Sequence, residues 1–128
     1  MNLLLDTHVA LWAITDHPRL SSRARALIES AEADVWVSVV SLWEIAIKHS
    51  LGRGDMPVSA RDAVRFFQQA GYRLLPLQAE HVLALESLAS HHQDPFDRLL
   101  VAQALAEPLR LMTHDSIVAK YSEAIERV

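Results

Sequence analysis

The sequence predicts one α/β domain over residues 1–128, a three-layer α/β/α sandwich around a central, mostly parallel sheet of four to five strands. Short apolar runs alternate along the chain with segments whose apolar residues recur at helical spacing. Strands joined by helices in this way imply right-handed crossovers between parallel strands, with helices on both faces of the sheet. The 128 residues, 51% of them hydrophobic, are enough for one core, and no repeat or linker divides them.

The first expected elements are a strand and two helices. Residues 3–5 are three leucines in a run too short for a helix, which is typical of a buried strand. A helical turn is expected over residues 9–14, before an Asp-His-Pro sequence that breaks it. Apolar residues then share one helical face over 20–31, and Ser21 or Ser22 can cap the start of that helix.

The middle of the chain repeats this order. Residues 35–40 are β-branched and aromatic, which favours a second strand, and a helix is expected from Ser41 onward. A loop that contains two glycines follows over 51–57. A further helix over 60–67 is expected to end at Gly71, since glycine is favoured just after a helix C-terminus.

The last part of the chain is expected to complete the sheet. The expected elements are a strand over 72–77 weakened by Pro76, helices around 82–89 and 96–104, a strand over 109–113, a short helix over 116–121 and a last strand over 124–128. The sheet therefore has four to five strands.

Composition excludes several classes of protein. The absence of cysteine excludes a disulfide scaffold, a thiolate zinc site and a thiol nucleophile. No stretch approaches the roughly 18 apolar residues of a membrane span, and the N-terminus lacks the basic lead of a signal peptide, so we expect a cytoplasmic protein without membrane contact. The net charge of −4 argues against a protein that coats nucleic acid. All basic residues except Lys48 and Lys120 are arginine, which suits phosphate contacts, so a nucleic-acid substrate remains compatible with the composition.

Acidic residues follow the predicted strands, where open parallel sheets bind their ligands. Asp6 ends the first strand, Glu44 lies in the helix after the second, and Asp115 follows the predicted strand near the C-terminus. Asp94 and Asp97 open a helix in the last third of the chain. The fold is therefore able to bring carboxylates from four separate segments to one edge of the sheet.

Most of these acids also have a purely structural explanation. Ser41 and Glu44 have the spacing of a capping box, and Glu44 can pair with Lys48 one turn later. The segment 94–97 has the pattern of an N-cap aspartate, a proline at the first helical position and an acid in the first turn. Asp115 can cap the short helix that follows it. Capping and metal binding do not exclude each other.

Asp6 is the acid that capping explains least well, because an unpaired carboxylate at the end of a buried central strand costs several kcal/mol. Clustered carboxylates repel one another and raise one another's pKa unless a cation is present. Mg²⁺ or Mn²⁺ takes oxygen ligands and binds through a few carboxylates together with substrate phosphate. The residues therefore predict metal-assisted hydrolysis of a phosphodiester.

The histidines and tryptophans carry weaker signals. No histidine pair has the spacing of a zinc-binding helix, and His8 and His114 are placed near the expected site only by their adjacency to the acids. Trp12, Trp36 and Trp43 lie in apolar stretches, so packing in the core or a dimer interface is predicted for them rather than stacking on RNA bases.

Four motifs, in this order, resemble the PIN-domain ribonucleases, and among them the VapC-type toxins of bacterial toxin–antitoxin pairs. They are Leu3-Leu4-Leu5-Asp6-Thr7-His8, Ser41-Leu42-Trp43-Glu44-Ile45, Asp94-Pro95-Phe96-Asp97-Arg98-Leu99-Leu100-Val101-Ala102-Gln103-Ala104 and Leu111-Met112-Thr113-His114-Asp115. The ordered set covers nearly the whole chain. The resemblance implies a PIN-like fold and an endoribonuclease that depends on Mg²⁺ or Mn²⁺.

The resemblance also implies roles for individual residues. The family's four acids, which are expected to be catalytic and to hold the metal, match Asp6, Glu44, Asp97 and Asp115. Asp94 is an additional acid that either joins the site or only caps the helix. Thr7 and Thr113 match small hydroxyl positions that orient ligands through hydrogen bonds. Lys48 and Arg98 are candidates for phosphate contacts, with ion pairs to the nearby acids as the alternative.

Family membership further implies an RNA substrate, a homodimer and a cognate antitoxin whose peptide covers the active site. The antitoxin would bind operator DNA, so this chain would meet DNA only indirectly. Two other functions stay open from the residues themselves. One is a metal-dependent phosphatase acting on a small phosphoester, although His8 stands where an aspartyl-phosphate enzyme would want a second aspartate. The other is a non-catalytic PIN-like module that binds a partner, in which the acids only cap helices.

Overall fold

A single parallel sheet with strand order β3-β2-β1-β4-β5 organises the fold. The computed structural model describes residues 1–128. The strands are β1 (Asn2–Leu5), β2 (Asp34–Ser38), β3 (Arg73–Leu75), β4 (Arg110–Thr113) and β5 (Glu126–Arg127). All four neighbouring pairs are parallel. The sheet expected from the sequence is therefore confirmed, and each of its strands lies inside or within a residue of the range that was expected.

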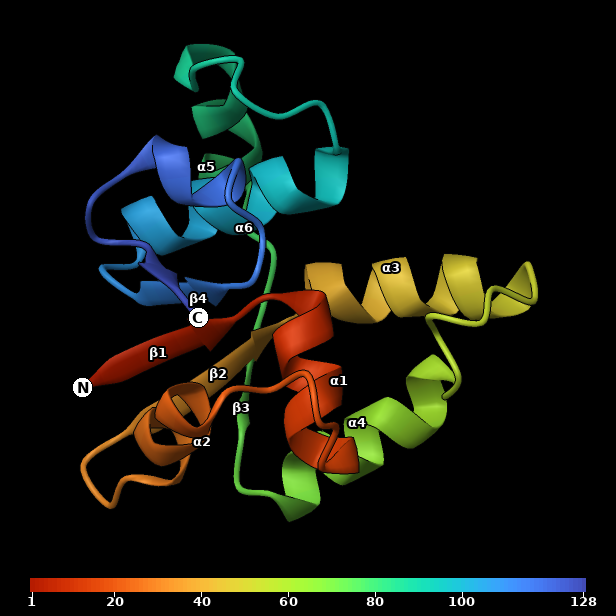
Figure 1. Cartoon of the computed structure of the whole chain (residues 1–128). Helices are drawn as coiled ribbons and strands as arrows, with labels where there is room; N and C mark the ends of the chain where they lie inside the picture. The colour runs from red at the N-terminus through yellow and green to blue at the C-terminus, as the bar shows by residue number, and fades with distance from the viewer.

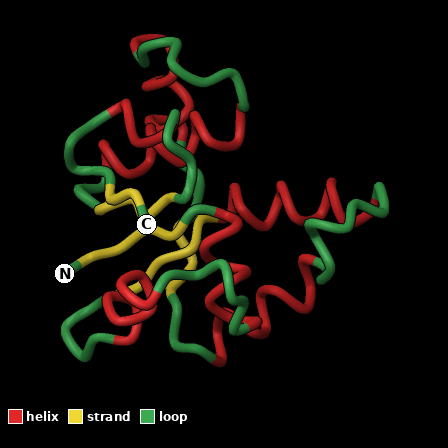
Figure 2. The backbone as a smooth tube through the Cα atoms, in the orientation of Figure 1, coloured by secondary structure: helices red, strands yellow, loops and turns green.

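Helices connect the strands and cover the sheet on both faces, as Figure 2 shows for the strands that lie between two groups of helices. They are α1 (Thr7–Thr15), α2 (Ser22–Glu29), α3 (Val39–Ser50), α4 (Ala60–Gln69), α5 (Ala79–Leu83) and α6 (Pro95–Ala106), with 3₁₀ turns η1 (Ala84–Ser87) and η2 (Val118–Tyr121). Ser21 caps α2 by accepting a hydrogen bond from the N–H of Ala24, as its sequence predicts. None of these helices combines the length and the apolar character needed to cross a bilayer.

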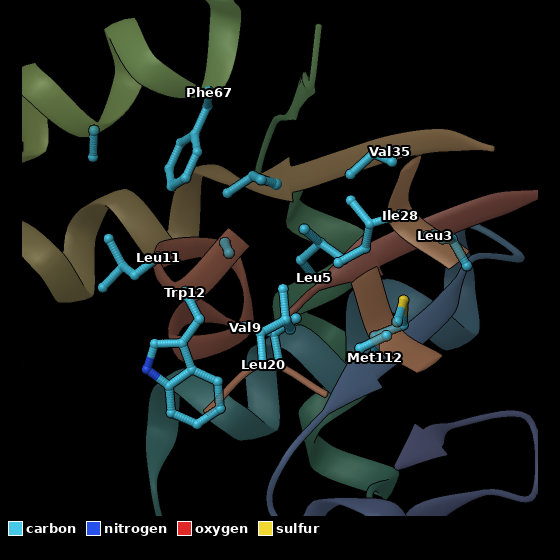
Figure 3. Close-up of a cluster of buried hydrophobic side chains, with 14 of the residues drawn as sticks. Leu3, Leu5, Val9, Leu11, Trp12, Leu20, Ile28, Val35, Phe67 and Met112 are labelled. Atoms are coloured by element: carbon cyan, nitrogen blue, oxygen red, sulfur yellow. The ribbon is translucent and has the colours of Figure 1, made fainter. Parts of the chain in front are cut away.

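The three leucines of β1 serve both cores, because successive side chains of a strand point to opposite faces of the sheet. Leu3 and Leu5 belong to the cluster that packs against α1, α2 and α4 (Figure 3). Leu4 belongs to the cluster on the other face, which α6 covers. All three leucines are completely buried. Because β1 is buried on both faces of the sheet, three successive residues of the strand are apolar.

The direction in which successive strands are added reverses at β1, since β2 and β3 lie on one side of it and β4 and β5 on the other. This reversal positions the site. The helices after β1 and β2 cover one face, and those after β3 cover the other, so that α1, α2 and α4 lie opposite α5 and α6 (Figure 1). β4 pairs with the free side of β1. The chain therefore leaves the carboxyl ends of β1 and β4 toward opposite faces, which is the arrangement that opens a ligand-binding crevice in α/β sheets.

The start of α3 differs from the expectation. The helix begins at Val39, and Ser38 is its N-cap, accepting a hydrogen bond from the N–H of Val40. The Ser38 hydroxyl also donates to Gln103 Oε1 at 2.5 Å, so a contact with α6 fixes the cap one turn earlier than expected. The proposed capping box of Ser41 and Glu44 is therefore wrong, and both residues lie inside the helix.

The tryptophans differ in their exposure. Trp12 is buried and Trp36 is half-buried, in agreement with the expected packing. Trp43 is 48% exposed on α3, where it meets Phe96 edge-on, so core packing is wrong for this residue. Packing of Trp43 in a dimer stays a prediction.

Candidate active site

Asp6 forms the centre of the site, because the end of β1 holds its carboxylate rigidly. Its backbone N–H donates to Met112 O, which continues the pairing with β4. Oδ1 accepts a hydrogen bond from the N–H of Val9, so Asp6 is also the N-cap of α1. Oδ2 accepts one from the Thr113 hydroxyl at 2.6 Å. Burial raises the pKa of Asp6, while the hydrogen bonds from Thr113 and Val9 oppose this rise.

Three of the predicted acids line one cavity of about 260 Å³ at the carboxyl ends of β1 and β4. They are Asp6, Asp97 and Asp115, and the same cavity is lined by Thr7, His8, Trp12, Arg19 and His114. The acids come from the β1–α1 junction, the first turn of α6 and the loop after β4. Segments that are far apart in the sequence therefore deliver carboxylates to one place.

Asp97 has the most perturbed carboxyl group of the site. Burial, followed by the charges of Asp94, Asp6 and Glu44, raises the pKa of Asp97 to about 7. His92 opposes this rise. Burial and the repulsion between carboxylates together let Asp97 hold a proton near neutral pH, unless a cation replaces that proton.

Asp115 is held by the segment that follows it and by the loop that precedes α6. Its Oδ1 accepts hydrogen bonds from the N–H groups of Ile117 and Val118, and its Oδ2 lies 3.1 Å from Nε2 of His92. Burial alone would raise the pKa of Asp115, but the hydrogen bonds from His92 and from the two backbone groups outweigh it and lower the pKa. Asp115 therefore remains charged when Asp97 takes up a proton.

Glu44 adjoins the cavity but does not line it. Its side chain is almost fully buried in α3, with the Thr7 hydroxyl 2.6 Å from Oε1 and Lys48 Nζ 2.5 Å from Oε2. The ion pair expected between Glu44 and Lys48 is therefore present. Thr7 itself lines the cavity, so it lies between Glu44 and the other acids. The charge of Glu44 reaches the cavity, since it contributes to the raised pKa of Asp97.

Asp94 acts as the N-cap of α6. Its Oδ1 accepts hydrogen bonds from the N–H groups of Phe96 and Asp97, and Pro95 occupies the first helical position. The capping pattern expected for this segment is present. Asp94 does not line the cavity, and its charge acts on the site through Asp97.

The structure adds two residues that the sequence did not single out. His92 Nε2 lies within 3.3 Å of Asp97 Oδ2 as well as close to Asp115, and these three side chains form a potential metal-binding group. Arg19, in the loop after α1, lines the acid cavity. The contact between His92 and Asp115 joins residues 23 positions apart and depends on how two loops meet, so no local motif marks it. His8 and His114 do line the cavity, as their adjacency to the acids predicted.

The donor set fits a hard divalent cation. The carboxylate oxygens of Asp6, Asp97 and Asp115 surround an open, polar cavity, and oxygen donors of this kind suit Mg²⁺ or Mn²⁺. The pKa of Asp97 is raised by burial and then by the negative charges of Asp94, Asp6 and Glu44, and a bound cation would offset these charges. His92 suits this role less well, because its Nδ1 accepts the N–H of Asp94 and the proton consequently stays on Nε2.

The sequence model of the PIN domain matches residues 3–124. The chain belongs to the PIN-domain family. Ribonuclease VapC22 of Mycobacterium tuberculosis is 32% identical to this PIN domain over 118 residues, which are 88% of this chain and 86% of that protein. The resemblance inferred from the four sequence motifs is therefore confirmed.

Solved structures of low sequence identity share the fold of this PIN domain. VapBC2 from Rickettsia felis, bound to a DNA fragment from its promoter, superposes with a TM-score of 0.70 at 18% identity and covers 100% of this chain and 98% of that chain. VapBC-1 from nontypeable Haemophilus influenzae gives 0.67 at 15% identity, covering 100% of this chain and 97% of that chain. The PIN-like α/β/α fold expected from the sequence is confirmed.

Proposed function

We propose that this PIN domain, acting as one unit over residues 1–128, is a metal-dependent endoribonuclease and the toxin of a toxin–antitoxin pair. The observation that carries the proposal is the convergence of Asp6, Asp97 and Asp115 on one cavity at the edge of the sheet. The similarity to a ribonuclease of the VapC type supports RNA as the substrate. Such an enzyme would act in the cytoplasm, where its RNA substrates are.

The metal would be held by Asp6, Asp97 and Asp115. Glu44 would be a fourth ligand when its ion pair with Lys48 breaks. Mg²⁺ and Mn²⁺ both suit these oxygen donors. The chemistry that such a cation supplies when bound is neutralisation of phosphate charge and activation of water. Asp94 contributes charge and caps α6, and it is not needed as a ligand.

Other side chains keep the acids in place. Thr113 and the N–H of Val9 each occupy one oxygen of Asp6, which orients the remaining lone pairs toward the cavity. Thr7 does the same for Glu44. His92 donates from Nε2 to Asp115, which keeps the loop after β4 close to α6. These hydrogen bonds support the orienting role that the family resemblance implies for both threonines.

The partners that we propose are a cognate antitoxin and a second copy of this chain, with operator DNA bound by the antitoxin. The structural neighbours named VapBC2 and VapBC-1 support an antitoxin partner. An apolar stripe on α3 supports a protein interface, since exposed apolar side chains recur there every fourth residue. Its members are Val39, Trp43, Ile47 and Leu51.

The experiment compares cleavage of single-stranded RNA by the parent and by Asp6→Asn, with Mg²⁺ or Mn²⁺ present. We expect Asp6→Asn to lower the cleavage rate by roughly 100-fold or more, because it removes a ligand charge. Asp34→Asn is the matched control, since Asp34 is exposed at the amino end of β2, on the opposite edge of the sheet.

Circular dichroism establishes that both variants fold. Cleavage by Asp6→Asn at the parent's rate would contradict the nuclease assignment. Turnover of p-nitrophenyl phosphate without RNA cleavage would favour the phosphatase alternative, and an absence of Mn²⁺ binding by calorimetry would favour the non-catalytic module.

A further inference from the structure

Arg19 is the one arginine that lines the acid cavity, yet its guanidinium forms no ion pair with any carboxylate there. The other candidates for phosphate contacts are already engaged. Lys48 is paired with Glu44, Arg53 is paired with Asp55, and Arg98 donates to backbone carbonyls and to the Tyr121 hydroxyl. Arg19 is therefore the free cation at this site.

A stacking contact fixes where the Arg19 guanidinium lies. Its central carbon is 5.0 Å from the ring centroid of Trp12. Trp12 is buried, and Figure 3 shows its ring at the edge of the core cluster formed with α1. His17 stacks on the same indole at 5.7 Å, and His114 contacts it edge-on at 5.1 Å. Stacking leaves the N–H groups of a planar guanidinium free to bind a phosphate.

A second cavity of about 190 Å³ lies beside the acid cavity, along α1. The two cavities share His8, Trp12 and Arg19. The loop that contains Gly54 and Asp55 also lines the second cavity. His8 Nε2 lies 3.4 Å from Asp55 Oδ2, which connects that loop to α1. The acid cavity thus has a neighbouring cavity lined by rings and a cation.

We propose that Arg19 binds the phosphate next to the one that is cleaved, and that the second cavity takes the nucleotide attached to it. This inference rests on the proposed nuclease function. An RNA strand that enters a site rich in carboxylates, on a chain of net charge −4, needs local positive charge. Arg19 supplies that charge beside the acids without neutralising them. Aromatic and histidine rings next to a phosphate-binding arginine suit an unpaired nucleotide.

The experiment measures RNA binding and cleavage by Arg19→Gln, Arg19→Lys and the control Arg110→Gln. Arg110 is exposed at the amino end of β4, away from both cavities. Arg110→Gln therefore removes the same charge as Arg19→Gln, but outside the site. Binding of a 2′-O-methyl RNA, which resists cleavage, is followed by fluorescence anisotropy with Mg²⁺ present, and cleavage of the unmodified RNA gives KM and kcat. Calorimetry with Mn²⁺ measures metal binding separately.

We expect Arg19→Gln to raise Kd and KM about 10-fold, with kcat and Mn²⁺ affinity close to those of the parent. The slope of log Kd against log salt concentration should fall by about one, as expected when one phosphate contact is lost. Arg19→Lys should recover part of the affinity, because it keeps the charge and loses the planar stack. Arg110→Gln should resemble the parent.

An unchanged Kd and salt dependence in Arg19→Gln would overturn this inference, and the nuclease proposal would stand if the parent cleaves RNA. If the parent binds RNA and Arg19→Gln weakens this binding, but the parent does not cleave RNA, the subsite stands and the nuclease proposal is wrong.

Discussion

His92 Nε2 lies 3.1 Å from Asp115 Oδ2, and this contact joins the loop before α6 to the loop after β4. His92 Nδ1 accepts the N–H of Asp94, so the ring presents an N–H, and not a lone pair, to the acids. His92 therefore supplies a hydrogen-bond donor to the carboxylates when no cation is bound.

Replacing His92 by phenylalanine should destabilise the metal-free protein by roughly 1–3 kcal/mol, because Asp115 loses a donor and the acids repel one another more strongly. Urea denaturation at pH 8, with and without Mn²⁺, measures the effect. Saturating Mn²⁺ should shrink the difference between variant and parent. His91→Phe is the control, since His91 is exposed and touches none of the acids. Equal loss in both variants would argue against a specific role for His92.

The raised pKa of Asp97 makes the stability of the metal-free protein depend on pH. Because this carboxyl has a pKa of about 7 when folded, against 3.8 ordinarily, the folded state binds more protons between these values. The contribution of Asp97 is fully present below pH 3.8 and is lost as the pH rises through about 7. Asp97→Asn should therefore be more stable than the parent at pH 8 by roughly 1–3 kcal/mol, and equally stable at low pH.

Denaturation curves between pH 3.5 and pH 8.5, roughly the span over which the two pKa values act, measure this difference. Added Mn²⁺ should reverse the order at pH 8, since only the parent gains stability from the metal. A difference that does not change with pH would show that the acids around Asp97 do not act on it.

Lys48 occupies Oε2 of Glu44, so it competes with any cation for that carboxylate. Lys48→Met leaves an almost fully buried carboxylate without its counter-ion, so it should destabilise the metal-free protein by about 3 kcal/mol. If Glu44 is a fourth ligand, Mn²⁺ should restore more stability in Lys48→Met than it adds to the parent. Thermal denaturation with and without Mn²⁺ makes the comparison. Lys120→Met is the control, because Lys120 is exposed and unpaired.

Asp94 can be tested as a helix cap separately from its charge. Asp94→Asn keeps the acceptor for Phe96 and Asp97 and should change stability little, whereas Asp94→Ala should cost about 1 kcal/mol. Calorimetry should show Mn²⁺ affinity in Asp94→Asn within a few-fold of the parent. A much larger loss of affinity in Asp94→Asn would indicate that Asp94 is a ligand.

Much of this arrangement was accessible from the sequence, because it follows from local patterns. Three leucines before Asp6 indicate a buried strand whose end presents an acid, and the Asp94–Asp97 pattern indicates a helix N-terminus. The start of α3 was not accessible in the same way. Ser38 and Ser41 are both capable caps, Val39 and Val40 suit a strand or a helix, and the distant Gln103 decides between them.

The electrostatic roles were also beyond the sequence. The i+4 spacing of Glu44 and Lys48 predicted their ion pair, but only the fold shows that Thr7 covers the other oxygen of Glu44. His92 and Arg19 carry no motif of their own. Their importance arises from which loops meet at the edge of the sheet, and this depends on the order in which the strands pair.

The hydrogen bond from Thr113 to Asp6 joins residues 107 positions apart, so the acid cavity is complete only after β4 has paired with β1. A nascent chain that has not yet released β4 from the ribosome has neither Asp115 nor the strand that holds Asp6 in place. The growing polypeptide consequently cannot assemble the acid cavity until β4 and the loop after it have emerged.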